Sequence, residues 1–435
     1  MQCATDQITV RTDDKDRALS DRAFKKVIIR FLPVMIFAYV IAYIDRTNIG
    51  FAALTMNKDL GLSPLEFGWG AGVLFFGYCF CEVPSNALLY RVGARRWLAR
   101  IMVTWGLTAA AMALVVGPKS FYLARFLLGV AEAGFTPGAM YFFTAWFPVH
   151  YRSRLMSWWY MSVPAASLVS GPLSSLIMQM DGVLGLAGWK WLFIAEGVPA
   201  VVIGVLLLRI LTERPEDANW LTPEERAVVI RTLASEKRER PVTNLWAAMA
   251  DSRVLVLAAI QLCFGIGSYA VAIWLPLILK GHNLSNFAVG MVAAIPYLFG
   301  CIGTVIWANR VDRSGLRIGN LAAACLVGAV GLLVAVRFPT LAMSMVGLSI
   351  ALIGITSARG IFWSIPPRFL TGLGAAGGLA FINSIGTLGG FFGPVIMGWL
   401  KTATGSFAVG LAVMGCFMVV ASVLTLGMRL VVRQE

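Results

Sequence analysis

Four charged residues interrupt the apolar stretches of this 435-residue chain at positions where chemistry could occur. Asp45 and Arg46 are adjacent, and Arg125 and Glu132 lie seven positions apart. An ionisable group costs at least ~2.5 kcal/mol in the middle of a membrane-spanning helix, so such groups tend to face a cavity and to be functional. A carboxylate away from water favours its neutral form, and a guanidinium can bind a carboxylate through two parallel hydrogen bonds. These residue types therefore indicate proton binding and anion recognition.

The spacing of these residues predicts how they face one another. Seven positions on a helix place Arg125 and Glu132 on one face, two turns apart, with Gly129 between them leaving room for a neighbouring helix or for solvent. Asp45 and Arg46 point about 100° apart and must face different neighbours. Asp45 and Arg125 should lie at a similar depth, which favours a pair between them, and Glu132 should lie near the middle of the membrane. Our hypothesis is that Asp45 and Glu132 bind the proton and that Arg46 and Arg125 bind the anion. The alternative for Asp45 is a structural ion pair.

Three polar residues at a comparable depth could donate hydrogen bonds to an anion: Tyr43, Tyr78 and Asn383. Each could instead form a hydrogen bond between helices. Arg359, with Trp363 and Ser364 one turn on, could be a second anion contact, or its side chain could extend to the end of its helix; the second interpretation is slightly favoured. Glu82 lies near Arg91 and Arg95, which favours a structural ion pair.

The elements that carry these residues are predicted to be membrane helices. Hydrophobic residues make up 58% of the chain and charged residues 13%, against roughly a quarter charged in a soluble domain. A span needs about 20 apolar residues, and the first run is followed by no cleavage site, so it is expected to be retained. The fold class is predicted to be an all-α polytopic membrane protein with 12 transmembrane helices in two pseudo-symmetric six-helix halves. The predicted spans are 28–52, 66–90, 97–116, 119–145, 154–180, 189–210, 253–280, 286–308, 317–336, 339–364, 372–400 and 406–429.

The distribution of basic residues predicts the orientation. With the N-terminus in the cytoplasm, the inside segments hold 27 Lys or Arg and the outside loops hold six, which is the positive-inside pattern. Both termini are therefore expected on the cytoplasmic side of a bacterial-type inner membrane. In the predicted linker, Thr222, Pro223 and Glu225 form a capping box that should start a surface helix. The expected divisions are 1–27 (cytoplasmic segment), 28–211 (first half), 212–252 (linker), 253–430 (second half) and 431–435 (cytoplasmic tail).

Two landmarks indicate an internal repeat. Gly93, in "RVGARR", and Gly315, in "RSGLR", are 222 residues apart, and so are Pro172, which ends "SGP", and Pro394, which ends "FGP". The shared offset equals a displacement of six spans. Repeats of this kind are typical of secondary transporters, in which the substrate site lies near the middle of the membrane between the halves.

The same segments resemble a known family. "NALLYRVGARR", "DRSGLR" and "SVPAASLVSGP" are similar to conserved patterns of the major facilitator superfamily. "YIDRTNIGFAAL", "RFLLGVAEAGFTPG" and "INSIGTLGGFFGP" are similar to its anion:cation symporter branch. The resemblance implies proton-coupled uptake of a small organic anion such as tartrate, a sugar acid or an aromatic acid. The chain departs from the superfamily loop pattern at Asn86 and Tyr90, where glycine and aspartate are usual, whereas the second copy keeps Asp312.

Other function classes are disfavoured. The sequence holds no HExxH, GxSxG or GxxxxGK[ST] pattern, which argues against an enzyme or an ATP-driven pump. Two histidines and seven scattered cysteines predict neither a metal site nor a cofactor. The net charge of +14 comes from residues between apolar runs, so it indicates topology in a lipid bilayer and not nucleic-acid binding. A monomer is expected; exchange or sodium coupling is the alternative to proton symport, and a channel or a receptor is the alternative class.

Overall fold

The computed structural model describes residues 2–236, 250–338, 340–366 and 372–431. Part of the predicted linker (237–249), Arg368 and the end of the predicted tail (432–435) lie outside the described residues. Within the described ranges the chain forms helices and no strand, which confirms the predicted all-α class. The long helices are α1 (Gln2–Asp59), α2 (Pro64–Val92), α3 (Ala94–Ala111), α4 (Pro118–Glu132), α5 (Phe135–Trp146), α6 (Val149–Ile177), α7 (Gly188–Ile210), α8 (Pro223–Glu236), α10 (Ser252–Lys280), α11 (Asn286–Ser314), α12 (Arg317–Arg337), α13 (Leu341–Phe362), α14 (Gly372–Thr404) and α15 (Phe407–Val431).

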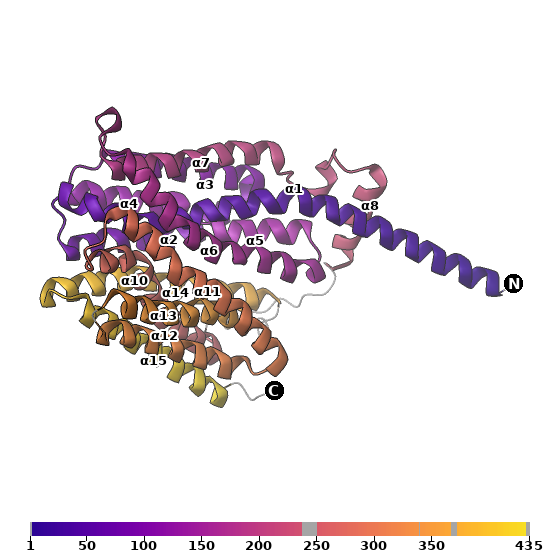
Figure 1. Cartoon of the computed structure of the whole chain (residues 1–435). Coiled ribbons are helices and arrows are strands. Elements are labelled where there is room, and N and C mark those ends of the chain that lie inside the picture. Colours follow the sequence, from indigo (N-terminus) through magenta and orange to yellow (C-terminus); the bar gives the residue numbers. More distant parts are fainter. Residues whose placement is uncertain (1, 237–249, 339, 367–371, 432–435) are drawn as a thin grey trace.

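The helices agree with the predicted membrane spans. Among the described residues, 11 helical segments are long and apolar enough to cross a bilayer, and one of them consists of α4 and α5 together. The remaining predicted span corresponds to α6, which is 29 residues long and packs between α1 and α11. The chain is therefore a polytopic membrane protein whose helices lie roughly side by side (Figure 1).

The internal repeat is visible in the helix boundaries. α2 and α11 begin 222 residues apart, at positions 64 and 286, and end 222 apart, at positions 92 and 314. Each begins at an N-cap serine, Ser63 or Ser285, whose side chain accepts a backbone hydrogen bond. Each ends at a glycine of positive φ, 97° at Gly93 and 66° at Gly315, a region that glycine enters without steric cost. The offset predicted from two short motifs is confirmed at both ends of the repeated helix.

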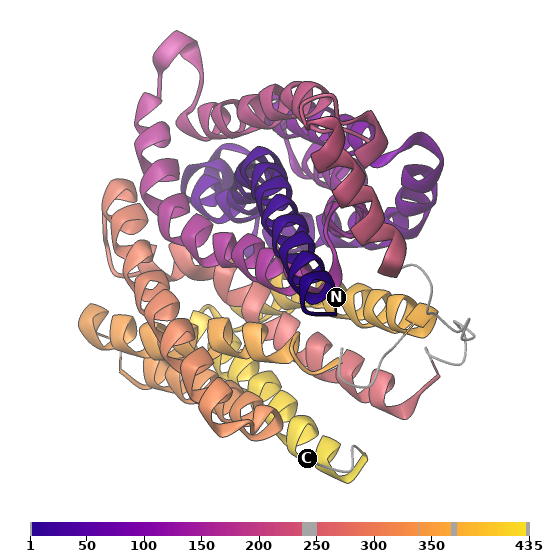
Figure 2. The ribbon, with the colours of Figure 1, turned by 90° about the vertical axis from the view of Figure 1, so that its right-hand side faces the viewer.

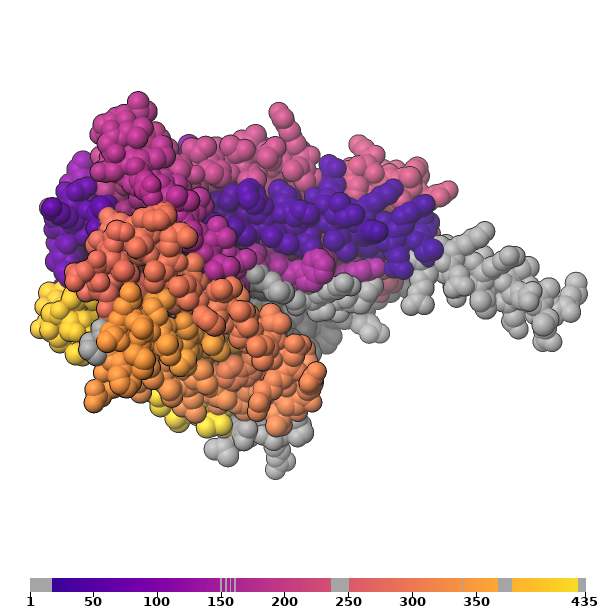
Figure 3. Space-filling model, viewed as in Figure 1, coloured from indigo at the N-terminus to yellow at the C-terminus, as the bar shows by residue number. Residues whose placement is uncertain are grey.

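The two sets of helices meet along three pairs: α1 with α10, α2 with α14 and α6 with α11. Figures 1 and 2 show the earlier helices, in indigo to magenta, on one side of this junction and the later helices, in orange to yellow, on the other. A β-carbon at Gly50 would lie 2.3 Å from the carbonyl oxygen of Ile273, and one at Gly171 would lie 2.5 Å from that of Gly290. These close approaches need glycine, and both lie in the part of the bundle far from α8. Figure 3 shows the earlier helices above the later ones, with the end of the earlier set that carries α8 extending beyond the later set.

The predicted span over 119–145 is confirmed as one membrane-spanning segment, Pro118–Trp146, but this segment is divided into α4 and α5. α4 ends at Glu132, and Gly134 takes the left-handed conformation with φ 90°. The hydroxyl of Ser85 donates to the carbonyl of Ala133 at 2.7 Å, which satisfies a backbone acceptor that the break leaves without an intrahelical partner. The break therefore places the Glu132 carboxylate at a helix end within the membrane.

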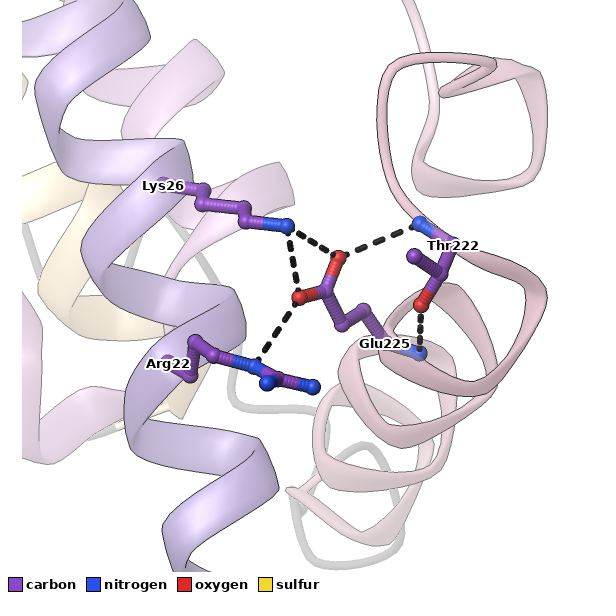
Figure 4. Close-up of polar contacts among 4 residues, drawn as sticks. All are labelled: Arg22, Lys26, Thr222 and Glu225. Atoms are coloured by element: carbon purple, nitrogen blue, oxygen red, sulfur yellow. Dashed lines mark hydrogen bonds and ion pairs between the residues drawn. The ribbon is translucent and has the colours of Figure 1, made fainter.

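The predicted surface helix is α8, and its capping box is confirmed (Figure 4). The backbone N–H of Thr222 donates to Glu225 at 3.1 Å, and the N–H of Glu225 donates to the Thr222 hydroxyl at 3.3 Å. The Glu225 carboxylate also pairs with Lys26 at 2.7 Å and with Arg22 at 3.3 Å, both from α1. Burial raises the pKa of Glu225, but the hydrogen bonds from Lys26 and Thr222 and the two positive charges lower it more, so the net pKa lies below its usual value. Two ion pairs thus connect α8 to α1, the helix that carries Asp45 and Arg46.

Candidate functional site

Arg46 and Glu132 form an ion pair between α1 and α4. The Nε of Arg46 lies 2.6 Å from Oε1 of Glu132, and the guanidinium carbon lies 5.1 Å from the centre of the Tyr78 ring. The second carboxylate oxygen of Glu132 is buried and has no hydrogen-bond partner among the described residues. The sequence placed both residues in the site, but it did not predict that they pair.

Arg125 packs against the backbone of α2. Its Nε and Nη2 atoms lie 3.4 Å from the carbonyl oxygens of Gly70 and Ala71, respectively. Its Nη1 atom is buried without a partner in the described part of the chain. The predicted Asp45–Arg125 ion pair is not formed, because no oxygen of Asp45 lies within 4.0 Å of this guanidinium among the described salt bridges. Gly129 accommodates a neighbouring helix and not solvent, since its β-carbon would lie 2.0 Å from the Leu74 carbonyl oxygen.

Asp45 is held by neutral donors. The indole N–H of Trp105 donates to one of its oxygens at 2.6 Å, and the amide of Asn48 donates to the other at 3.0 Å. The same Asn48 nitrogen donates to Glu196 at 2.7 Å, and the hydroxyl of Ser174 donates to the second Glu196 oxygen at 3.1 Å. A network over α1, α3, α6 and α7 therefore joins two buried carboxylates. Asp45 therefore forms no structural ion pair among the described salt bridges, and its hydrogen-bond partners are neutral groups.

The second half contributes Arg359 from α13. Its Nη2 atom donates to the Ser268 hydroxyl at 2.8 Å, and its guanidinium carbon lies 5.8 Å from the ring centres of both Phe264 and Tyr269. These partners belong to α10, so the side chain is directed into the helix bundle and does not extend to the end of α13; the favoured interpretation of Arg359 is wrong. Tyr39 and Tyr269 interact electrostatically with both Arg46 and Arg359. One arginine from each half therefore interacts with the same two tyrosines.

Glu82 links the two halves. Its carboxylate accepts from the Asn383 amide and from the Ser384 hydroxyl of α14, each at 3.2 Å. The predicted ion pair with Arg91 or Arg95 is absent among the described residues. The reason is geometric, because the side chain of Glu82 faces α14 whereas Arg95 donates to the Leu208 carbonyl. Asn383 is thus brought to the junction between the halves, where it forms a hydrogen bond between helices, the alternative that the sequence left open for it.

Of the remaining predicted site residues, two tyrosines lie near the arginines and two residues at the end of α13 do not. Tyr43 lies beside the guanidinium of Arg359, and Tyr78 lies under Arg46. Trp363 packs edge-on against Phe362 with ring centres 5.4 Å apart, and the Ser364 hydroxyl donates to the Ile361 carbonyl. Tyr43 and Tyr78 therefore border the arginines, whereas Trp363 and Ser364 contact their own turn of the chain.

Solvent access differs sharply within the site. The side chain of Arg46 is 16% exposed, whereas Asp45, Arg125 and Glu132 are only 1–3% exposed. Arg359 and Asn383 are partly exposed. Arg46, Arg359 and Asn383 therefore keep some solvent contact, whereas the Asp45 and Glu132 carboxylates and the Arg125 guanidinium are almost completely buried.

The sequence reasoning missed Glu196, Asn48 and Trp105. Glu196 stands inside the sixth predicted apolar span, "WLFIAEGVPAVV", so the criterion that selected Asp45 applies equally to it. Asn48 is one turn after Asp45 and 0% exposed, but nothing in the sequence shows that its amide joins two carboxylates. That relationship depends on the packing of α1 against α7.

Comparisons with known proteins agree with this geometry. Residues 35–379 match the model of the Major Facilitator Superfamily. The chain is 44% identical to a "Putative tartrate transporter" of Agrobacterium vitis over 94% of this chain and 91% of that protein. It is 41% identical to a "Quinolone resistance transporter" of Acinetobacter baumannii over 92% of this chain and 93% of that protein. The partially occluded inward-open structure of the xylose transporter XylE from E. coli covers 92% of this chain and 97% of its own with a TM-score of 0.73. At 14% identity, this last likeness shows the fold alone.

Proposed function

Because this chain belongs to the Major Facilitator Superfamily, we propose that it carries a small organic carboxylate across the membrane by proton-coupled symport with alternating access. Asp45 and Glu132 bind the proton. Arg46 is the principal anion contact, with Arg125, Tyr43, Tyr78 and Asn383 around it, and Arg359 is a second contact from the other half. Cytoplasmic termini and an inner-membrane location belong to the same proposal, supported by the distribution of basic residues.

The observation that carries the proposal is the 2.6 Å ion pair between Arg46 and Glu132. A substrate carboxylate and the Glu132 carboxylate compete for one guanidinium, because Arg46 has a single planar edge for a bidentate contact on that side. Protonation of Glu132 weakens the pair and frees Arg46 for the substrate. Loss of the proton restores the pair and displaces the substrate. One arginine thereby couples proton binding to anion binding.

The charge balance inside the membrane supports the same coupling. Of the acidic and basic residues that lie at least five positions from either end of a predicted span, four are carboxylates, at Asp45, Glu82, Glu132 and Glu196, and three are guanidinium groups, at Arg46, Arg125 and Arg359. With every group ionised the interior carries a net charge of −1, which repels an anion. One bound proton makes the interior neutral, and two make it +1. Proton binding therefore has to accompany anion binding in a low-dielectric interior.

The substrate class that we propose rests on two partly exposed guanidinium groups, those of Arg46 and Arg359. Arg46 and Arg359 come from opposite halves and share Tyr39 and Tyr269 as neighbours. An anion with two carboxylates, or with one carboxylate and several hydroxyl groups, can contact both arginines at once. The relative named as a tartrate transporter supports this class. Contact with both halves is also what a substrate needs to favour one arrangement of the halves over another.

The packing between the halves supports alternating access. Close approaches such as Gly50 to Ile273 lie one turn beyond Arg46, so the halves are packed closely on that side of the arginines. Movement of the halves about the site would exchange the open and closed sides, as in transporters built from repeats.

The proposal is tested first with the purified protein and then in liposomes. A thermal-shift screen against mono- and dicarboxylic acids should find acids that stabilise the protein, and uptake of the best ligand should rise when the outside is acidified.

The role of Glu132 is tested by substitution. Glu132→Gln should reduce proton-driven accumulation of the substrate by about ten-fold or more, and substrate counterflow should remain detectable. Glu216→Gln, which removes an exposed carboxylate outside the membrane, is the matched control. Intact pH-driven accumulation by Glu132→Gln would remove that residue from the mechanism. Accumulation driven by counter-anion or sodium alone would replace symport by exchange or by sodium coupling.

A further inference from the structure

We propose that Glu196 is a further proton-binding residue, which shares one proton with Asp45 through Asn48. The inference rests on the proposed proton-coupled transport and adds to it a residue of α7 that faces neither Arg46 nor Glu132 in the described contacts. It predicts that the protein has two proton sites: the Glu132 carboxylate at Arg46, and the carboxylate pair formed by Asp45 and Glu196.

The first argument is the arrangement of donors. One amide nitrogen of Asn48 donates to both carboxylates, at 3.0 Å to Asp45 and 2.7 Å to Glu196. Trp105 donates to the other oxygen of Asp45, and Ser174 donates to the other oxygen of Glu196. All four hydrogen bonds come from neutral groups, and no cation lies within 4.0 Å of either carboxylate among the described salt bridges.

The second argument is burial. Asp45 is 3% exposed, Glu196 is 5% exposed, and Asn48 between them is 0% exposed. The two carboxylates accept from one nitrogen atom, so they repel each other when both are ionised, and burial deprives each of its hydration. The state of the pair with one bound proton is therefore much lower in free energy than the state with none. The pair should then titrate as a unit in which the proton belongs to both residues.

The charges that surround the pair come from two helices. Arg125 and Glu132 on α4, and Arg46 on α1, interact electrostatically with Asp45. The neighbours that α3 and α6 direct at the pair, Trp105 and Ser174, do not ionise near neutral pH. Among the described residues Arg125 is the one almost fully buried cation, at 1% exposed, and it has no ion-pair partner. Its charge favours one remaining negative charge on the pair, so a single shared proton is the expected state.

The third argument is that the Asn48 side chain can also form a hydrogen bond with a protonated carboxyl group of the pair. Its amide oxygen is buried and has no partner among the described residues. If the side-chain amide of Asn48 flips, so that its oxygen and nitrogen exchange places, the oxygen can accept a hydrogen bond from a protonated carboxyl group. The amide nitrogen is a donor and cannot do so. In uptake, a proton from water on one side forms an O–H bond with a carboxylate oxygen of the pair, and it returns to water on the other side without any redox step.

The proton on the pair is measured without substrate by infrared difference spectroscopy of the purified protein during a pH titration. We expect a protonated-carboxyl band that disappears as the pH rises, and Glu196→Gln should shift its midpoint to lower pH by about one unit or more, because Asp45 then loses the neighbouring charge that helps to hold the proton. Asp45→Asn should alter the same band. A spectrum that neither substitution changes would overturn the inference, and so would a carboxyl band that never titrates, since Glu196 would then be a permanently neutral structural group.

Transport supplies the second measurement. In liposomes, Glu196→Gln should move the pH of half-maximal uptake in the acid direction by a similar amount, whereas Glu216→Gln should keep the wild-type profile. If the wild-type protein moves no organic acid together with protons, the proposed function fails while the infrared titration can still succeed. If wild-type transport is proton-coupled but Glu196→Gln keeps both the wild-type pH profile and the wild-type band, only the inference about Glu196 fails. Should Glu196→Gln not reach the membrane in folded form, the infrared titration of Asp45→Asn decides the question alone.

Discussion

The Nε atom of Arg46 lies 2.6 Å from Oε1 of Glu132, and this pair joins α1 to the end of α4 at the break in the fourth span. The guanidinium keeps 16% of its side-chain surface exposed, whereas the carboxylate keeps 1%. The cation is therefore the more accessible partner of the pair. In the proposed function a substrate reaches the arginine before the carboxylate, and this order leads to the first prediction below.

Arg46→Lys should raise the KM for a carboxylate substrate by about 10–100-fold while some transport persists. Lysine keeps the positive charge but cannot form the planar two-point contact, and a hydrogen bond to a charged group contributes about 1.5–3 kcal/mol. Initial uptake rates at several substrate concentrations measure the change. An unaltered KM in Arg46→Lys would show that the substrate carboxylate binds elsewhere.

Glu82 and Asn383 should be energetically coupled, since their 3.2 Å hydrogen bond crosses between the halves. We expect Glu82→Gln and Asn383→Ala each to weaken substrate binding, and the double variant to be no worse than the more severe single variant. Coupling between contacting residues is typically about 0.5–3 kcal/mol. Binding measured by calorimetry for the four proteins completes the cycle, and strictly additive effects would show that the hydrogen bond is not made in the substrate-bound protein.

Gly129→Ala should destabilise the protein by about 1–3 kcal/mol, as expected for forcing extra volume into a packed interface. The new methyl group would lie 2.0 Å from the Leu74 carbonyl oxygen of α2. Gly427→Ala in α15 is the matched control, because no atom lies within 4 Å of its β-carbon position and alanine favours a helix by up to ~1 kcal/mol over glycine. Thermal unfolding in detergent compares the two, and equal midpoints would contradict the close packing of α2 on α4.

The attachment of α8 to α1 should weaken in acid. The pKa of Glu225 in the folded protein is lowered from 4.5, so its stabilising effect is complete above pH 4.5 and is lost as the pH falls through the lower, folded-state value. Hydrogen exchange of the α8 backbone amides should therefore accelerate in that acid range.

Substitution tests the same attachment at neutral pH. Glu225→Gln should already give fast exchange in α8 at neutral pH, because Lys26 and Arg22 lose their anionic partner. Glu224→Gln changes an exposed carboxylate in the same helical turn and should leave the exchange rates as they are. If both variants exchange at the wild-type rate, Glu225 does not hold α8 in place.

Much of the architecture could be predicted from residue types and spacing alone. Apolar runs of membrane length predicted the helices, because a bilayer leaves the backbone few other ways to satisfy its hydrogen bonds. The offset between Gly93 and Gly315 predicted the repeat, since a glycine of positive φ is a local requirement of the chain. The Thr222–Glu225 capping box was equally local, and it starts α8 as predicted.

The buried charges show where local information ends. Charge type and depth identified Asp45, Arg46, Arg125 and Glu132 as candidates, because burying an ion is costly wherever the helix lies. Which partner each one meets depends on how the helices rotate and pack, so Arg46 pairs with Glu132 while Asp45 receives hydrogen bonds from Trp105 and Asn48. The break after α4 and the hydrogen bonds that join Glu196 to Asp45 through Asn48 likewise depend on contacts between segments distant in the chain. The cost of burying a charge is thus determined by sequence, but the partner that offsets it is decided only by tertiary packing.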